Sequence, residues 1–287
     1  MSTTTLPAAT PTLPAAPRPT RSGLTFGRLV ASEWIKFRSL RSTWWTLAFA
    51  LGGMVGISLI FGIGIRANAV SATDEDSMLG VLGLTFGYTA AQLALAVLGA
   101  LTITGEYSTG MIRSTLAAAP RRLPALWAKL LVLTMVTVAV SFIGLALSYL
   151  VTLPLLSGTG VTVDLGNDET VRALLGVPLY LTAITLMAFA IGAIVRHSAG
   201  AITTTLGIML VVPMVFSILG IFASWAPRVG AYMPTTAGEQ IMSFGGIAGA
   251  GMVSDHSLSP WAGIGLLGGY VVVLLAVAAV LMRRRDA

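Results

Sequence analysis

The sequence contains no cysteine, which excludes disulfide bonds and thiolate metal sites. It also has little charge: only 10% of its 287 residues are Asp, Glu, Lys or Arg, whereas soluble domains average about a quarter. Apolar residues make up 55% of the chain, and the mean hydropathy is +0.87. This composition cannot cover the surface of a soluble protein and predicts a chain that is largely surrounded by lipid.

Long uncharged runs dominate the sequence. A helix needs about 20 apolar residues to cross a bilayer, and six windows reach that length: 42–65, 77–105, 130–163, 173–195, 197–227 and 257–282. The runs are continuous rather than alternating, which favours helices over a barrel. We therefore predict an all-α integral membrane protein with six transmembrane helices, near 44–65, 80–104, 130–154, 173–195, 199–223 and 260–282.

Basic residues are unevenly distributed among the connecting segments. The segments before the first span and after the second, fourth and sixth hold 14 of the 17 Lys and Arg residues. The alternate loops hold only three basic residues but eight of the eleven acidic ones. Because basic residues near span ends stay on the cytoplasmic side, both termini are predicted to be cytoplasmic. The isoelectric point near 10.2 thus reflects membrane orientation, and no nucleic-acid partner is expected.

The N-terminal part is predicted to differ from the rest. Residues 1–22 are rich in Pro, Thr and Ala, which predicts a disordered cytoplasmic tail, and residues 23–287 then form one six-span domain. Over 25–42, apolar residues recur at three- and four-residue spacing, which predicts an amphipathic helix lying in the membrane interface. The alternative is a simple cytoplasmic extension of the first span. The expected aromatic and cationic anchors are Trp34, Lys36 and Arg38.

Two connections have an unusual composition. The motif VRHSAG is very short and predicts a hairpin of the fourth and fifth spans. The external segment 224–259 is apolar and rich in glycine, so it either re-enters the outer leaflet or lies on the external surface. Within the spans, glycines at four-residue spacing allow close helix approach: Gly52/Gly56, Gly83/Gly87 and Gly265/Gly269.

The chain lacks the motifs of an enzyme. Its only lysines, Lys36 and Lys129, do not follow a glycine, so no phosphate-binding P-loop is present. It has no Gly-x-Ser-x-Gly elbow, and His197 and His256 are predicted on opposite sides of the membrane. No catalytic residue, metal site or cofactor is therefore expected in this chain.

Polar residues within the predicted spans are few. No charged residue lies near a span centre, which argues against an ion-coupled carrier, because such carriers place ionisable groups there. The intramembrane polarity comes from Tyr88, Gln92, Thr203, Thr204 and Thr205. Such an interior suits a protein that takes its energy from elsewhere and handles an apolar or amphipathic substrate.

The segment TGEYSTGMIRSTLAAAPRRLPALWAKLL, residues 104–131, interrupts two apolar runs with mostly basic charge. Glu106 lies where the second span ends, and Arg113 follows two helical turns later, so one helix face could present both. Gly110 permits a bend between them. The residues alone leave two interpretations: a short helix that receives a soluble partner, or a connector that obeys the positive-inside rule.

The order of these parts resembles the permease subunit of an ATP-binding-cassette (ABC) exporter of the ABC type-2 permease superfamily, over roughly residues 24–285. SEWIKFRSLRSTWWTL resembles the segment that leads into the first span of bacterial members. GEYSTGMIRSTLAAAPRRLPALWAKLL resembles their second-to-third span loop. VRHSAGAI and YMPTTAGEQI resemble their fourth-to-fifth span turn and last external loop.

This resemblance implies a function in the bacterial cytoplasmic membrane. Two permease subunits, as a homodimer or heterodimer, would form the pathway, and a separate ATPase subunit would carry ATP and Mg. The segment 25–42 would be the connecting helix and 107–119 the coupling helix. The second and fifth spans would line the dimer interface, with Gln92 and the three threonines near the path. The remaining alternatives are a stand-alone secondary carrier or channel, and a non-transport membrane scaffold.

The resemblance also assigns individual residues. Those expected to couple the chain to the ATPase are Glu106, Gly110, Met111, Arg113, Arg121 and Arg122. Those expected to shape the last external loop are Pro234 and Gly238. Membrane lipids are the remaining expected partner.

Overall fold

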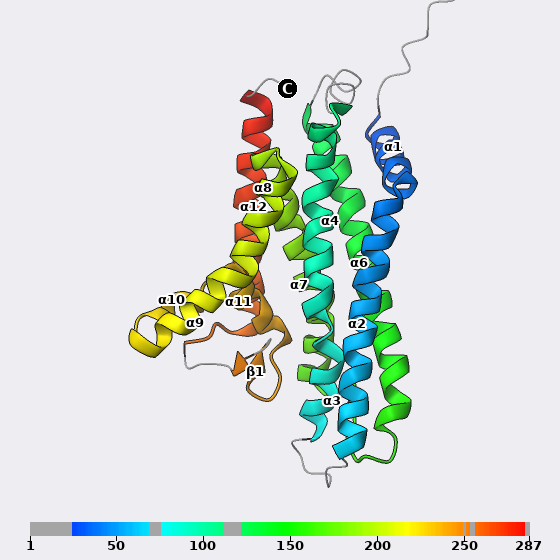
Figure 1. Ribbon diagram of the computed structural model, residues 1–287, viewed down its shortest axis with the longest axis vertical. Coiled ribbons are helices and arrows are strands. Elements are labelled where there is room, and N and C mark those ends of the chain that lie inside the picture. The colour runs from blue at the N-terminus through cyan, green and yellow to red at the C-terminus, as the bar shows by residue number, and fades with distance from the viewer. Residues whose placement is uncertain (1–24, 69–75, 112–121, 249–250, 253–255, 285–287) are drawn as a thin grey trace, which may run out of the picture.

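The computed structural model of the chain describes residues 25–68, 76–111, 122–248, 251–252 and 256–284 (Figure 1). Within these residues, six helical spans are long and apolar enough to cross a membrane. The prediction of six transmembrane helices is therefore confirmed. The predicted tail at 1–22 lies outside the described residues. The spans are Arg41–Ala67, Met78–Ser108, Leu123–Leu156, Asp168–Val195, Ser198–Phe222 and Pro260–Arg284.

Helices account for almost all of the described elements. Helix α1 (Phe26–Ser39) precedes the first span. The spans are formed by α2 (Arg41–Asn68), α3 (Asp76–Thr85) with α4 (Tyr88–Ser108), α6 (Arg122–Leu156), α7 (Asp168–Val195), α8 (Ser198–Leu206) with the π-helical turn η1 (Gly207–Val211) and α9 (Val212–Phe222), and α12 (Pro260–Arg284). The last connection holds α10 (Ala226–Gly230), α11 (Pro234–Glu239), η2 (Gln240–Met242) and the antiparallel strands β1 (Ile247–Ala248) and β2 (Gly251–Met252).

The long helices run side by side along the longest axis of the molecule (Figure 1). Helix α1 and the C-terminal end of α12 lie at the same end of this bundle, which we call the α1 end. Helix α9 diverges from the bundle toward the opposite end. Pro213 is the second residue of α9, just after η1, and because proline has no N–H to donate, the regular hydrogen-bond ladder is interrupted there.

Helices α4 and α7 form the centre of the bundle. Their facing side chains, such as Leu95, Ile184 and Phe189, are completely buried. Gly99 is required at this contact, because a Cβ there would collide with the carbonyl oxygen of Thr185. In lipid the hydrophobic effect does not drive helices together, so this close packing is what holds α4 against α7.

Of the three glycine pairs predicted to allow close helix approach, only the pair in the second span lies at a helix contact. In the second span, a Cβ at Gly87 would lie 2.5 Å from the carbonyl oxygen of Met54, so this glycine permits close contact with α2. Gly83 likewise faces Phe61. The pairs of the first and sixth spans do not work in this way, because a Cβ would meet no atom within 4 Å at Gly52, Gly56, Gly265 or Gly269.

Two spans extend beyond their predicted bounds because the predictions stopped near charged residues. Helix α6 begins at Arg122 rather than near 130 and includes Lys129, which is buried. Helix α4 continues past the predicted end at 104 and includes Glu106, which is also buried. Both charges can lie inside packed helices because each is neutralised by an ion pair.

The fourth and fifth spans form the predicted hairpin. Helix α7 ends at Val195 and α8 begins at Ser198. Between them, Arg196 adopts a left-handed conformation with φ of 60°, which reverses the chain direction. His197 caps α8, because its Nδ1 accepts a hydrogen bond of 3.2 Å from the Gly200 backbone N–H.

The last connection packs against the spans instead of extending away from them. A Cβ at Gly263 of α12 would collide with the carbonyl oxygen of Ala237, so α11 and α12 are in close contact. Arg172 of α7 donates hydrogen bonds to the carbonyl oxygens of Ile241 (3.2 Å) and Ser243 (2.7 Å). This cation satisfies the carbonyls at the end of η2 and holds the connection on α7. Re-entry of this connection into the outer leaflet stays a prediction.

Candidate functional site

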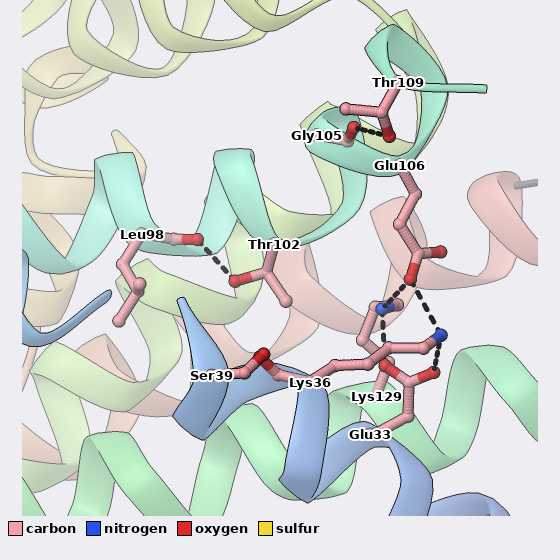
Figure 2. Close-up of polar contacts among 9 residues, drawn as sticks. All are labelled: Glu33, Lys36, Ser39, Leu98, Thr102, Gly105, Glu106, Thr109 and Lys129. Carbon is pink, nitrogen blue, oxygen red and sulfur yellow. Dashed lines mark hydrogen bonds and ion pairs between the residues drawn. The ribbon is translucent and has the colours of Figure 1, made fainter. Parts of the chain in front are cut away.

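Four charged residues meet at the α1 end of the bundle. Glu33 and Lys36 lie one turn apart on α1, so they share one helix face. Glu106 comes from the last turn of α4, and Lys129 comes from the first part of α6. Figure 2 shows their side chains converging from these three helices. We call this cluster the four-charge network.

The network is a ring of alternating charges. Lys129 Nζ lies 2.6 Å from Glu33 Oε2 and 2.9 Å from Glu106 Oε1. Lys36 Nζ lies 2.9 Å from Glu33 Oε1 and 3.2 Å from Glu106 Oε1. Each lysine therefore bridges both carboxylates (Figure 2). Each helix of the three is tied to the other two by at least one ion pair.

Most of this network is hidden from solvent. Glu33, Glu106 and Lys129 expose only 5%, 8% and 6% of their surfaces. Burial acts to raise the pKa of Glu33, but its ion pair with Lys129 and the hydrogen bonds from both lysines lower the pKa below its ordinary value. Burial acts to lower the pKa of Lys36, but hydrogen bonding to Glu33 and the charge of Glu106 raise the pKa. The folded protein therefore keeps these two residues ionised.

A buried ion pair is costly to break. Removing one partner leaves an uncompensated charge, at a cost of about 3–5 kcal/mol in soluble proteins. The network therefore resists separation of α1, α4 and α6.

Beyond Glu106, the chain leaves α4 through a bend. The hydroxyls of Ser108 and Thr109 donate hydrogen bonds of 3.0 and 2.8 Å to the Gly105 carbonyl oxygen, which satisfies the helix end. Gly110 then has φ of +71°, a conformation that favours glycine, as the predicted bend requires. Met111 follows with 46% of its surface exposed. The bend thus begins directly after the four-charge network.

The rest of the predicted coupling helix, 107–119, lies largely outside the described residues. Arg113 and Arg121 both lie outside the described residues, so the predicted pairing of Glu106 with Arg113 stays a prediction. Arg122 is the first residue of α6, and its side chain is also outside the described part. Among the described residues, the partners of Glu106 are the two lysines.

The predicted interface anchors of α1 lie in two directions. Trp34 and Arg38 line an apolar groove of about 510 Å³ between α1, α2 and α6. The Trp44 indole N–H donates a 3.0 Å hydrogen bond to the Arg38 carbonyl oxygen, which fixes the junction of α1 and α2. Lys36 instead turns toward the four-charge network. The helix predicted at 25–42 is present as α1, and its location in a membrane interface stays a prediction.

A second polar cluster lies inside the bundle. The Tyr180 hydroxyl, completely buried near the middle of α7, donates a 2.7 Å hydrogen bond to Gln92 Oε1 of α4. Glu239 Oε1, at the end of α11, lies 3.5 Å from the same hydroxyl. The ring of Tyr88 packs edge-on against Tyr180, with 5.3 Å between centroids. The last connection thus brings a carboxyl group to the level of residues within the spans.

This carboxyl group was not anticipated from the sequence. The spans themselves carry no charged residue near their centres, and Glu239 belongs to a connection assigned to the outside. The signal that could have revealed it is Pro234, which begins α11. Gly238 supplies a second signal, because a Cβ there would lie 2.5 Å from Leu267 Cδ2 of α12. Pro234 and Gly238 were predicted to shape the last external loop, and both lie in α11, a short helix that packs against α12.

The predicted pathway residues do not share one surface. Gln92 is buried and faces Tyr180. Thr203 and Thr204 are exposed on α8, whereas Thr205 is buried and donates a hydrogen bond to the Ala201 carbonyl oxygen. Consecutive residues on a helix point in different directions, so the side chain of Thr205 is separated from those of Thr203 and Thr204. The assignment of these residues to a pathway stays a prediction.

Chemistry by a metal centre has no support in the described part of the chain. No group of three or more His, Cys, Asp or Glu residues is close enough there to hold a metal ion. His197 serves as a helix cap, and His256 accepts a long hydrogen bond of 3.5 Å from Arg228.

A comparison with protein families identifies the class of this membrane protein. A family described as "ABC-2 family transporter protein" matches residues 29–213. The match covers more than half of the chain, and the chain therefore belongs to the ABC-2 transporter family. This confirms the resemblance to ABC type-2 permeases. Curated proteins gave no match.

Proposed function

We propose that this ABC-2 family member is the transmembrane subunit of an ATP-driven exporter. It would form the substrate pathway together with a second permease subunit, as a homodimer or heterodimer. A separate ATPase subunit, carrying ATP and Mg, would dock at the α1 end of the bundle. Family membership supports the general role, and the four-charge network supports the route by which energy enters.

The observation that carries this proposal is the position of Glu106. This residue lies in the last turn of a membrane span, immediately before the segment 107–119, and is ion-paired with both lysines of the network. A partner that displaces 107–119 would therefore move α1, α4 and α6 together. ATP binding and hydrolysis would shift the population between inward-open and outward-open states through such differential contacts.

The proposed orientation places the α1 end in the cytoplasm. The segments that connect the spans at this end, together with the two termini, hold 14 of the 17 basic residues. Basic residues near span ends are retained on the cytoplasmic side. A soluble ATPase could then reach Gly110 and Met111, which follow the network directly. The bilayer would be the bacterial cytoplasmic membrane.

The experiment that tests this function is purification of the tagged chain from its native membrane in mild detergent. We expect an ATPase subunit with a Gly-Lys-Ser/Thr phosphate loop to co-purify in stoichiometric amount. Glu106→Gln should reduce the amount retained or the transport per ATP hydrolysed, whereas Glu169→Gln, exposed at the other end of the bundle, should not. A chain that purifies alone and moves solutes in liposomes without ATP would instead be a stand-alone carrier or channel.

A further inference from the structure

A cavity of about 340 Å³ lies beside the four-charge network, between α1, the start of α2, the end of α4 and α6. Its volume is within the range of about 300–1000 Å³ that is usual for small-molecule sites. Apolar side chains form most of its wall, including Phe37, Leu98, Leu101 and Val132. Hydroxyl groups and the charged groups of the four-charge network form the rest. The cavity therefore suits an amphipathic molecule.

The hydroxyl groups of this wall favour a particular kind of head group. The hydroxyls of Ser39 and Thr46 donate to the carbonyl oxygens of Lys36 (2.8 Å) and Ser42 (2.9 Å). Those of Thr102 and Thr109 donate to Leu98 (2.6 Å) and Gly105 (2.8 Å), as Figure 2 shows. A hydroxyl has one hydrogen, so these four groups can only accept further hydrogen bonds.

The charged groups that line the cavity favour the same head group. The ammonium groups of Lys36 and Lys129 are already engaged by the two carboxylates of the network. An anionic ligand would have to compete with those carboxylates. Glu106, which also lines the cavity, has a buried Oε2 without a hydrogen-bond partner. Buried acceptors are nearly always hydrogen-bonded, so a ligand that donates a hydrogen bond to this oxygen would be stabilised.

We propose that this cavity binds an amphipathic molecule that carries a primary ammonium group. The ammonium would donate hydrogen bonds to Thr102 Oγ1 and its neighbouring acceptors, and the apolar body would lie against Leu98 and Leu101. An ammonium provides three donors and no acceptor, which complements a wall rich in acceptors. This binding does not depend on an ATPase, so it stands or falls separately from the proposed function.

The test uses the full-length chain alone in phosphatidylcholine nanodiscs. The probe is dansylcadaverine, which joins a primary amine to an apolar fluorophore, and its neutral N-acetyl derivative is the matched control. Binding is followed by the shift of dansyl fluorescence. We expect the amine to bind at least about tenfold more tightly than the acetylated probe, as expected for a hydrogen bond to a charged group. Equal affinity, or tighter binding of the neutral probe, would overturn the proposal.

Two variants locate the site. Thr102→Val removes an acceptor at nearly constant volume and should weaken binding of the amine about tenfold. Its control is Thr134→Val, which removes the same kind of hydroxyl from α6, where it bonds to the Leu130 carbonyl oxygen outside the cavity. If both variants weaken binding equally, the ammonium does not contact Thr102.

A second pair keeps the test decisive if Thr102→Val does not fold. A Cβ added at Gly105, which lines the cavity, meets no atom within 4 Å, so Gly105→Leu should extend into the cavity and abolish binding. Gly265→Leu adds the same side chain in open space on α12 and should leave binding unchanged. Full binding by Gly105→Leu would show that the amine binds elsewhere.

The same chemistry has two natural sources, a soluble amphipathic amine or the head group of phosphatidylethanolamine. Adding phosphatidylethanolamine to the nanodiscs distinguishes them. Displacement of dansylcadaverine would identify the membrane lipid as the occupant. Undiminished binding at a high lipid fraction would identify a soluble amine.

Discussion

Lys129 Nζ lies 2.6 Å from Glu33 Oε2, although 96 positions separate the two residues in the sequence. Both side chains are buried, and each is tolerated there because the other compensates its charge. The pair joins the helix that precedes the first span to the helix that begins the third. With Glu106 and Lys36, it ties the last turn of α4 to α1 and α6.

The first prediction concerns the stability that this pairing provides. Lys129→Met leaves Glu33 and Glu106 to share the remaining lysine, and we expect a loss of about 3–5 kcal/mol in the free energy of unfolding. Unfolding by denaturant or heat in detergent measures this loss. Arg28→Gln on the exposed side of α1 is the control and should change stability by about 0.5 kcal/mol or less. Similar effects in both variants would show that the network is not structural.

The second prediction concerns pH. The pKa of Glu33 in the folded protein is below its ordinary value of 4.5, so the unfolded state binds the proton more readily. The stabilisation is therefore complete above pH 4.5 and is lost as the pH falls through the lower folded pKa. We expect the unfolding temperature to fall as the pH drops below 4.5, and to fall less steeply in Glu33→Gln. Glu169→Gln, which is exposed, should keep the wild-type slope.

The sequence was sufficient to predict the number, type and approximate position of the spans. Long uncharged runs are a local signal, and lipid requires backbone groups to be satisfied within each helix. The predicted bounds of the second and third spans were too short, because a charged residue was taken as the end of each span. Glu106 and Lys129 were placed at edges, yet both lie within helices, because their charges cancel across helices that are distant in the sequence.

The two polar clusters could not be predicted for the same reason. Pairing of Lys129 with Glu33, or of Tyr180 with Glu239, depends on which helices are neighbours, and no local pattern in one chain specifies that. The sequence did identify Glu106 as important. It placed Glu106 and Arg113 on one helix face, because sequence spacing reveals neighbours on one helix only. That pairing stays a prediction, because Arg113 lies outside the described residues.

The third prediction concerns the buried hydroxyl of Tyr180. Tyr180→Phe removes the donor to Gln92 and leaves the amide oxygen unsatisfied, which should cost about 1–3 kcal/mol. Tyr270→Phe is a matched control, because it removes the same atom from a hydroxyl that is exposed and donates a 3.2 Å bond to the Tyr232 carbonyl oxygen. Unfolding in detergent compares the two. A Tyr180 variant as stable as the Tyr270 variant would contradict a structural role for the hydroxyl.

The fourth prediction concerns the bend after α4. Gly110 has φ of +71°, which proline cannot adopt and which asparagine tolerates better than most other residues. We expect Gly110→Pro to uncouple ATP hydrolysis from transport in the reconstituted complex, whereas Gly110→Asn retains most of the coupling. Both variants should insert normally, which size-exclusion chromatography checks. Normal transport by the proline variant would count against a coupling role for this bend.

The fifth prediction concerns the surface between two permease subunits. Because the sequence contains no cysteine, a single introduced cysteine reports one position without background. Thr204→Cys, exposed on α8, should form dimers in native membranes with a short bismaleimide if the fifth spans of two copies face each other. Val272→Cys, 66% exposed on α12, should stay monomeric because this face would contact lipid. Crosslinking at Val272 but not at Thr204 would place the interface on α12, and a product of another mass at Thr204 would indicate a heterodimer.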